Sequence, residues 1–268
     1  MKKEHRYHLG VKSNVRILSL VDSFAMEASY KLTDFGANAQ RPELREYLVE
    51  EQDVHLTAYA DPNTYQLIEY VNKLATILNR QHICIDEQGL IKGLLNLPEI
   101  KDKWEKLKKE LMQVNPIAAF EIVKQKDREL AQPVELIDNL SNAHFMHLFL
   151  YTYPFSKRTE DILSQQQWMR DRMGIGFAIP VLQTFRLSTT EEGKVVSVET
   201  ILDEKKKIDK ALLVKVTGQE TVQLKHFTRA EFLYEETGVL LTAHMHIFEQ
   251  LNEEYTTDLY LDLKRNHD

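Results

Sequence analysis

The C-terminal third constrains the fold most, because apolar and polar residues alternate there over long stretches. From Tyr255 to Leu263, every second residue is apolar except Thr257, and polar side chains fill most positions between them. The preceding segment has apolar residues at every second position from Val239 to Ile247. A period of two places successive side chains on opposite faces of a β-strand. The two segments therefore predict neighbouring antiparallel strands, each with one buried face, joined by a hairpin at 251–253.

Similar patterns predict six consecutive strands near the C-terminus, at residues 177–188, 194–202, 211–217, 221–234, 239–249 and 254–264. Glycines occur at three of the intervening turns, where a reversing chain needs their backbone freedom: Gly193, Gly218 and Gly238. Two further extended segments are expected near the N-terminus, at 6–21 and 46–59.

The middle of the chain has helical patterns instead. Asp61 can cap a helix and Pro62 suits its first turn, so a helix is expected over 62–80. A hairpin from Ile83 to Leu95 follows. Apolar residues at intervals of three and four then predict further helices that begin after Asn96 and Asn115 and near 134, with another at 161–172.

This order of elements predicts an α+β fold. We expect a curved antiparallel sheet, built as a meander and open as a half-barrel or closed as a barrel, with a helical insertion at about 61–172 packed on one face. No Pro/Gly/Ser-rich linker divides the chain, so a single domain over 1–268 is the preferred interpretation. The alternative is a separate helical domain over 61–172.

Composition restricts the partners. The 268 residues carry a net charge of −7, which argues against a broad nucleic-acid surface built from clustered Lys and Arg. No apolar run approaches the ~18 residues of a membrane-spanning helix. The single cysteine, Cys84, and a charged N-terminus without the apolar run of a signal peptide favour the cytoplasm. A cysteine-poor periplasmic protein would show the same cysteine content.

Two pairs of histidines are candidate metal ligands. His144 and His147 are three residues apart, on one face of a helix, and His244 and His246 are two apart, on one face of a strand. Four imidazoles from two rigid elements could bind zinc. Solvated or hydrogen-bonded histidines are the more ordinary interpretation. We find no catalytic signature and no phosphate-binding loop, and we expect no cofactor.

The most apolar stretch runs from Ala143 to Phe155 and is rich in aromatic residues. It is a candidate lid over an apolar cavity, membrane-surface anchor or partner-binding patch, or simply the helix packed deepest against the sheet. Together with inward strand residues it supplies the expected lining of a ligand cavity: Phe145, Phe149, Tyr151, Tyr153, Phe232 and Met245.

The leading functional hypothesis is a non-enzymatic binding or interaction protein that holds an apolar small molecule between sheet and helices or serves as a subunit of an assembly. The alternative is a metal-dependent hydrolase that uses the histidine pairs. Fold class alone does not decide between these classes.

Overall fold

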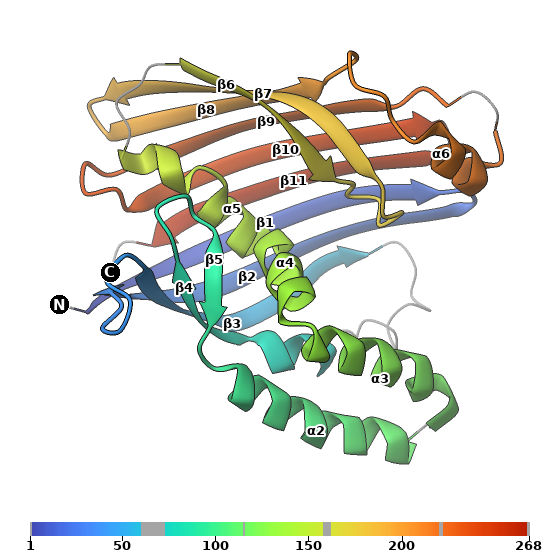
Figure 1. Cartoon of the computed structure of the whole chain (residues 1–268), viewed down its shortest axis with the longest axis horizontal. Coiled ribbons are helices and arrows are strands. Elements are labelled where there is room, and N and C mark those ends of the chain that lie inside the picture. The colour runs from blue at the N-terminus through green and yellow to red at the C-terminus, as the bar shows by residue number, and fades with distance from the viewer. Residues whose placement is uncertain (1, 60–72, 115, 158–161, 220–221, 267–268) are drawn as a thin grey trace.

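The computed structural model describes residues 2–59, 73–114, 116–157, 162–219 and 222–266. It contains one antiparallel sheet of eleven strands that is not closed (Figure 1). The α+β class, the antiparallel sheet and the helical insertion are thus confirmed, and of the two predicted forms the sheet adopts the open one.

The strands are β1 (Lys3–Ile17), β2 (Leu20–Ala37), β3 (Arg45–Tyr59), β4 (Arg80–Ile85), β5 (Ile91–Leu94), β6 (Ile162–Arg170), β7 (Ala178–Thr190), β8 (Gly193–Leu202), β9 (Lys225–Tyr234), β10 (Leu240–Asn252) and β11 (Tyr255–Asn266). The helices are η2 (Thr76–Leu78), α2 (Leu97–Val114), α3 (Pro116–Ala131), α4 (Pro133–Asn142), α5 (His144–Tyr151), η3 (Tyr153–Lys157) and α6 (Lys210–Thr217).

The strand order explains where the helices lie. Within the sheet the order is β5-β4-β3-β2-β1-β11-β10-β9-β8-β7-β6, so two meanders join where β1 pairs with β11. The strands β5 and β6 form the two opposite edges, and the helical insertion connects them along the chain. The connection must therefore pass from one edge to the other, and α4 and α5 lie across one face of the sheet (Figure 1). We call this the inner face.

Alternation along the strands decides which side chains face α5. On β1, Tyr7, Leu9 and Val11 are buried while the residues between them are partly or fully exposed.

At the turn between β7 and β8, Gly193 has a φ of 142°, and a Cβ there would lie 2.1 Å from the carbonyl oxygen of Tyr234. A side chain at this position would force the turn away from the neighbouring strand end.

Aromatic contacts fix α5 and η3 to strands of both meanders, on the same face of the sheet. Phe145 stacks on Tyr30 of β2 with ring centroids 4.3 Å apart. Phe155 stacks on Phe185 of β7 at 4.0 Å. Because one short helical segment contacts strands this far apart in the sheet order, the sheet curves around it. The apolar stretch of 143–155 is therefore buried core.

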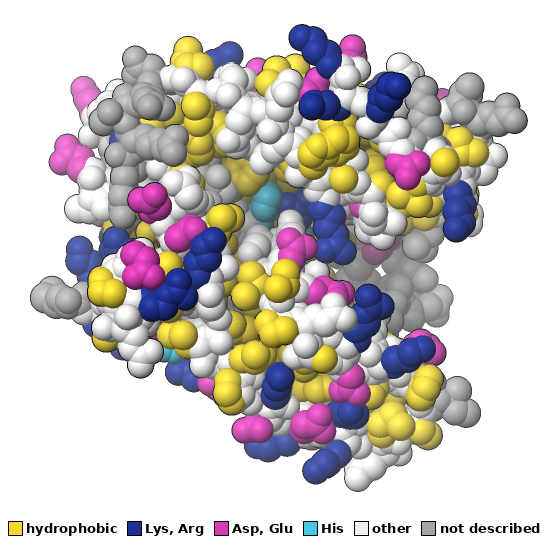
Figure 2. Space-filling view, in the orientation of Figure 1, with side chains coloured by type: hydrophobic (Ala, Val, Ile, Leu, Met, Phe, Trp, Pro, Cys, Tyr) yellow, Lys and Arg dark blue, Asp and Glu magenta, His cyan; other side chains and the backbone are white. Residues whose placement is uncertain are grey.

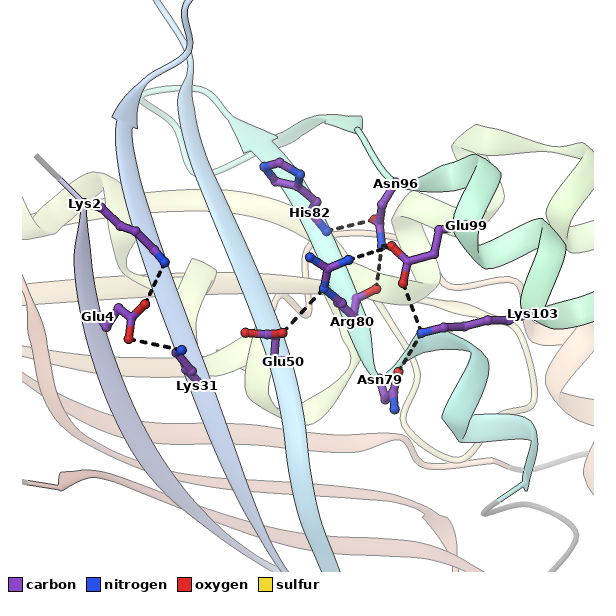
Figure 3. A network of polar contacts seen from close by, with 10 residues as sticks. All are labelled: Lys2, Glu4, Lys31, Glu50, Asn79, Arg80, His82, Asn96, Glu99 and Lys103. Atoms are coloured by element: carbon purple, nitrogen blue, oxygen red, sulfur yellow. Dashed lines mark hydrogen bonds and ion pairs between the residues drawn. The ribbon is translucent and has the colours of Figure 1, made fainter.

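The helices α2 and α3 bury a second, separate apolar cluster around Trp104, away from α5. The indole nitrogen of Trp104 donates a hydrogen bond of 2.7 Å to Asp127 on α3. A polar network ties α2 to the sheet: Arg80 lies 2.7 Å from Glu99 on α2 and 3.4 Å from Glu50 on β3 (Figure 3). The side chain of Asn96 links the ends of β4 and α2 by donating to the Arg80 carbonyl at 2.9 Å.

Two sequence-based assignments are wrong. The segment 161–172 was expected to be helical, but Ile162–Arg170 is the edge strand β6, because pairing with the long strand β7 outweighs the local preference of its three glutamines. The segment 211–217 was expected to be a strand, but it lies in α6. The Asp209 side chain caps this helix by accepting from the Leu212 N–H at 3.1 Å, and Gly218 ends it with a φ of 69°.

Smaller differences concern boundaries. The extended segment predicted at 6–21 is divided between β1 and β2, with the turn at Leu18, whose φ is 57°. An irregularity between Leu240 and Thr242 shifts the alternation of β10, so that Leu240 is buried together with Ala243. Most of the helix predicted at 62–80 lies outside the described residues.

Candidate functional site

Two cavities flank α5 on the inner face. The first, about 410 Å³, lies between the N-terminal end of α5, the loop after β6 and strands β1, β2 and β11. The second, about 370 Å³, lies between α5, η3 and strands β6 and β7. Figure 2 shows the surface hollowed beside the helices on this side of the molecule, with a histidine side chain visible in the depression.

The first cavity combines an apolar floor with polar walls. Val15, Phe24 and Leu259 supply apolar side chains from β1, β2 and β11. The polar lining comes from the same strands, from the helices and from the loop after β6: Ser13, Asn139, Asn142, His144, Arg170, Asp171, Arg172 and Thr257. Its size and mixed lining match those of small-molecule sites, which combine apolar surface with a few polar groups.

The second cavity has an apolar wall and a hydrogen-bonded one. Leu150, Phe155, Leu163 and Phe185 are among its lining residues. Opposite them, the Gln183 side chain donates to the Tyr151 hydroxyl at 2.6 Å. Its carbonyl oxygen also accepts from two glutamines of the edge strand: Gln165 at 2.9 Å and Gln167 at 2.6 Å. These polar groups already have partners.

Arg172 lies between the two cavities. It lines the first, and its Nη2 donates to Nε2 of His147, which lines the second, at 2.9 Å. Its Nη1 donates to the carbonyl oxygen of Asn142 at 3.2 Å. Its Nε–H is buried and has no hydrogen-bond partner among the described residues. The backbone N–H of Arg172 donates to Glu249 of β10 at 2.7 Å.

Both histidines of α5 are held neutral. Burial, assisted by the Arg172 charge, lowers the pKa of His144 to about 4. Burial, Arg172 and His144 together lower the pKa of His147 well below its usual value. A neutral His147 can accept a hydrogen bond from Arg172 at Nε2. The positive charge at this junction therefore belongs to Arg172.

Along the strand direction, the inner face has an apolar part packed against α5, then two rows rich in polar residues, and beyond them a further apolar cluster that includes Ile179, Leu224, Leu251 and Tyr255. We call the first part the apolar half and the two polar rows the polar half. One cross-strand row, in register from β7 to β1, is wholly apolar: Phe185, Val198, Ala230, Met245, Leu261 and Val11. The next row on the same face contains four buried polar residues: Gln183, Thr200, Thr228 and Ser13. The row beyond it contains His226, Glu249 and Thr257, which are also buried.

Several groups of this polar half have no hydrogen-bond partner among the described residues: His144 Nδ1, both ring nitrogens of His226, Thr228 Oγ1 and Thr257 Oγ1. His226 Nδ1 lies 3.4 Å from Glu249 Oε1, but it lacks the geometry of a hydrogen bond. Each such group raises the free energy of the folded state by about 1–3 kcal/mol unless something bonds to it. Such a cluster is characteristic of a site and uncharacteristic of a core.

The residues expected to line a ligand cavity lie together, but most of them pack against one another. Phe145, Phe149, Tyr153, Phe232 and Met245 are buried in the main core. Tyr151 stacks on Phe232 with ring centroids 6.0 Å apart and lines the second cavity. The cavity lining that sequence reasoning missed comes from Arg172, Thr257, Val15 and Phe24.

The two histidine pairs lie on opposite faces of the sheet. His144 and His147 are on α5 at the inner face, whereas His244 and His246 alternate with Ala243 and Met245 and face outward. His246 instead bonds Asp258 at 2.6 Å and stacks on Tyr260. The structure therefore does not bring the four histidines together, and the described residues contain no group of three or more His, Cys, Asp or Glu arranged to hold a metal ion.

A larger hollow of about 690 Å³ lies on the outer face. Its lining carries charges of both signs on neighbouring strands, such as Arg229 opposite Glu199. Among the described helices, none has the length and apolar character needed to cross a membrane.

Comparisons with known proteins bear on the fold alone. The chain matches no protein-family model and no curated protein. Among solved structures, it is similar to a chain of lipovitellin, solved to describe lipid–protein interactions in that protein, with a TM-score of 0.50 and 11% identity. The match covers 99% of this chain and 25% of the lipovitellin chain, so this chain spans about a quarter of that protein's length.

Proposed function

We propose that this protein is a non-enzymatic binding protein that holds an apolar or amphipathic small molecule on the inner face of its open sheet, beside α5. The observation that carries the proposal is the pair of cavities that flank α5 inside the curve of the sheet. Both have apolar walls, and each has the size of a small-molecule site.

The likeness to lipovitellin supports this proposal without deciding it. Lipovitellin interacts with lipid, and its chain includes a region of similar fold that extends over nearly all of this chain. Because one fold hosts many functions, the argument for this chain depends on its own cavities.

The proposal is tested by titrating the purified protein with a fluorescent fatty acid and with a neutral apolar dye. We expect saturable binding of at least one probe. A cavity-filling variant, Val15→Phe, should weaken binding at the first cavity because Val15 forms part of its floor. The matched control is Val21→Phe, which adds the same ring to an exposed position 52% accessible to solvent.

Absence of saturable binding by every apolar probe would refute the proposed function. Equal affinity in the two variants would place the ligand outside the first cavity. A protein partner remains a prediction that the same preparation can address, by light scattering of the mixture with cell extract.

A further inference from the structure

Two arginines, Arg170 and Arg172, line the first cavity, and Arg170 lies 3.4 Å from the carboxylate of Asp138. Among the described residues that line this cavity, Asp171 is the one acidic residue. The Asp171 carboxylate is already occupied, because it accepts three backbone N–H groups of the following loop, from Ile175 at 2.7 Å, Gly176 at 2.7 Å and Phe177 at 2.9 Å. Glu249 accepts from the Arg172 backbone, stabilises the charge of the Arg172 side chain and pairs across strands with Thr257, but it is not among the lining residues.

Three residues that line this cavity carry a buried polar atom without a partner among the described residues: His144, Arg172 and Thr257. In Arg172 this group is the Nε–H, and in Thr257 it is the hydroxyl. The other two nitrogens of the guanidinium are fixed by Asn142 and His147, so the orientation of the Nε–H is set in advance. A preorganised cationic donor and a free hydroxyl on two residues that line the same cavity suit an oxygen anion.

The apolar floor indicates what is attached to that anion. Val15, Phe24 and Leu259 lie in the same cavity as Arg172. A ligand that satisfies both parts must have an acidic head and an apolar tail.

We propose that the first cavity binds the carboxylate of a single-chain fatty acid through Arg172 Nε–H and the Thr257 hydroxyl, with the acyl chain against Val15, Phe24 and Leu259. This inference rests on the proposed function and specifies its ligand class. A charge-assisted hydrogen bond from a buried guanidinium is stronger than a neutral one. The cavity therefore discriminates by head group at equal chain length.

The test compares three ligands with the same twelve-carbon chain: dodecanoate, dodecanol and dodecylammonium. Isothermal titration calorimetry at pH 8, below the micelle concentrations of the two ionic ligands and the solubility limit of dodecanol, should show dodecanoate binding at least about tenfold more tightly than the other two. In Arg172→Met, which keeps an apolar stem of similar length, this preference should disappear. The matched control, Arg186→Met, removes an exposed arginine from the outer face and should leave the preference intact.

Equal affinities for dodecanoate and dodecylammonium, or a preference that survives in Arg172→Met, would overturn this inference while leaving the proposed function in place. Failure of all three ligands to bind would instead overturn the proposed function. Should Arg172→Met fail to fold, Thr257→Val decides: a reduced preference for dodecanoate supports the inference and an unchanged preference overturns it.

Discussion

The two halves of the inner face differ in how many of their buried polar groups have hydrogen-bond partners. In the apolar half, side chains of α5 and the strands pack against one another beside the second cavity, and even a buried polar group such as Thr152 has a partner, the Tyr234 hydroxyl at 2.6 Å. In the polar half, a cavity remains beside α5, and buried groups such as Thr228 Oγ1 have no partner among the described residues. The apolar half therefore stabilises the fold. The unpaired groups of the polar half lower the stability of the protein, and a ligand that bonds to them would restore it.

The largest expected effect comes from breaking the apolar half. Phe145→Ala removes a ring that stacks on Tyr30 and meets the edge of Tyr7, so the free energy of unfolding should fall by about 3–5 kcal/mol. Chemical denaturation followed by far-UV circular dichroism measures this change. Phe120→Ala, at a position 55% exposed on α3, is the control and should change stability by less than about 0.5 kcal/mol. A small loss in Phe145→Ala would contradict the assignment of this half as the core.

The second effect concerns pH and the polar half. Since the pKa of His144 is near 4 in the folded protein and 6.5 in the reference state, the unfolded chain binds its proton first as pH falls. The stabilisation by neutral His144 is complete above pH 6.5 and is lost between 6.5 and about 4, on the order of 3 kcal/mol in total. His147 should act in the same direction.

Denaturation midpoints measured from pH 7.5 to pH 4 test this effect. Carboxylates also titrate in this range, so the informative quantity is the difference between the wild-type protein and His144→Gln. The variant should lose less stability between pH 6.5 and 4.5 than the wild-type protein does. Parallel curves for the two proteins would contradict a buried, neutral His144.

The third effect is a pair of changes in the free energy of unfolding that have opposite signs in two matched Thr→Val variants. Thr228→Val replaces a buried hydroxyl without a partner and should raise the free energy of unfolding by about 1 kcal/mol. Thr152→Val removes a partnered hydroxyl and leaves Tyr234 without it, so it should lower that free energy by about 1 kcal/mol. Thermal unfolding of both variants gives the comparison. Two changes of the same sign would mean that the halves do not differ as described.

The smallest expected effect concerns the N-terminal cap of α6, the helix whose sequence pattern predicts a strand. Asp209→Ala removes the cap of α6 and should destabilise the protein by about 0.5–2 kcal/mol, whereas Asp209→Asn should be nearly neutral. Equal losses in the two variants, measured by denaturation, would show that the carboxylate charge matters more than the cap.

Much of the fold could be predicted because alternation is strong where one face of a strand is buried. The strands β10 and β11 follow directly from their apolar periods. The strand β6 could not be predicted in this way, because its exposed Ile162 and Trp168 lie on the outer side of an edge strand and give no buried stripe. The helix α6 did carry a usable signal, in a capping Asp209 before it and Gly218 after it, which its apparent alternation obscured.

The site was less predictable, although part of its signal is visible in the alternation. Glu249 continues the buried series of Ala243, Met245 and Ile247, and Thr257 is in phase with Leu259. Polar residues in a buried series indicate a polar pocket on the inner face. No local pattern could show that Arg172, which directly follows an unrecognised strand, meets His147 between two cavities, because that contact depends on the crossing of the whole insertion.

Photo-crosslinking tests the central claim, that the inner face beside α5 binds the ligand, most directly. The protein is irradiated with a saturating photoactivatable fatty acid, with unlabelled fatty acid as competitor, and the modified peptides are mapped by mass spectrometry. We predict competed labels on β1, β11 and the segment from α4 to α5 that line the first cavity. Competed labels confined to the outer face of β8 to β10, or to α2 and α3, would contradict the account.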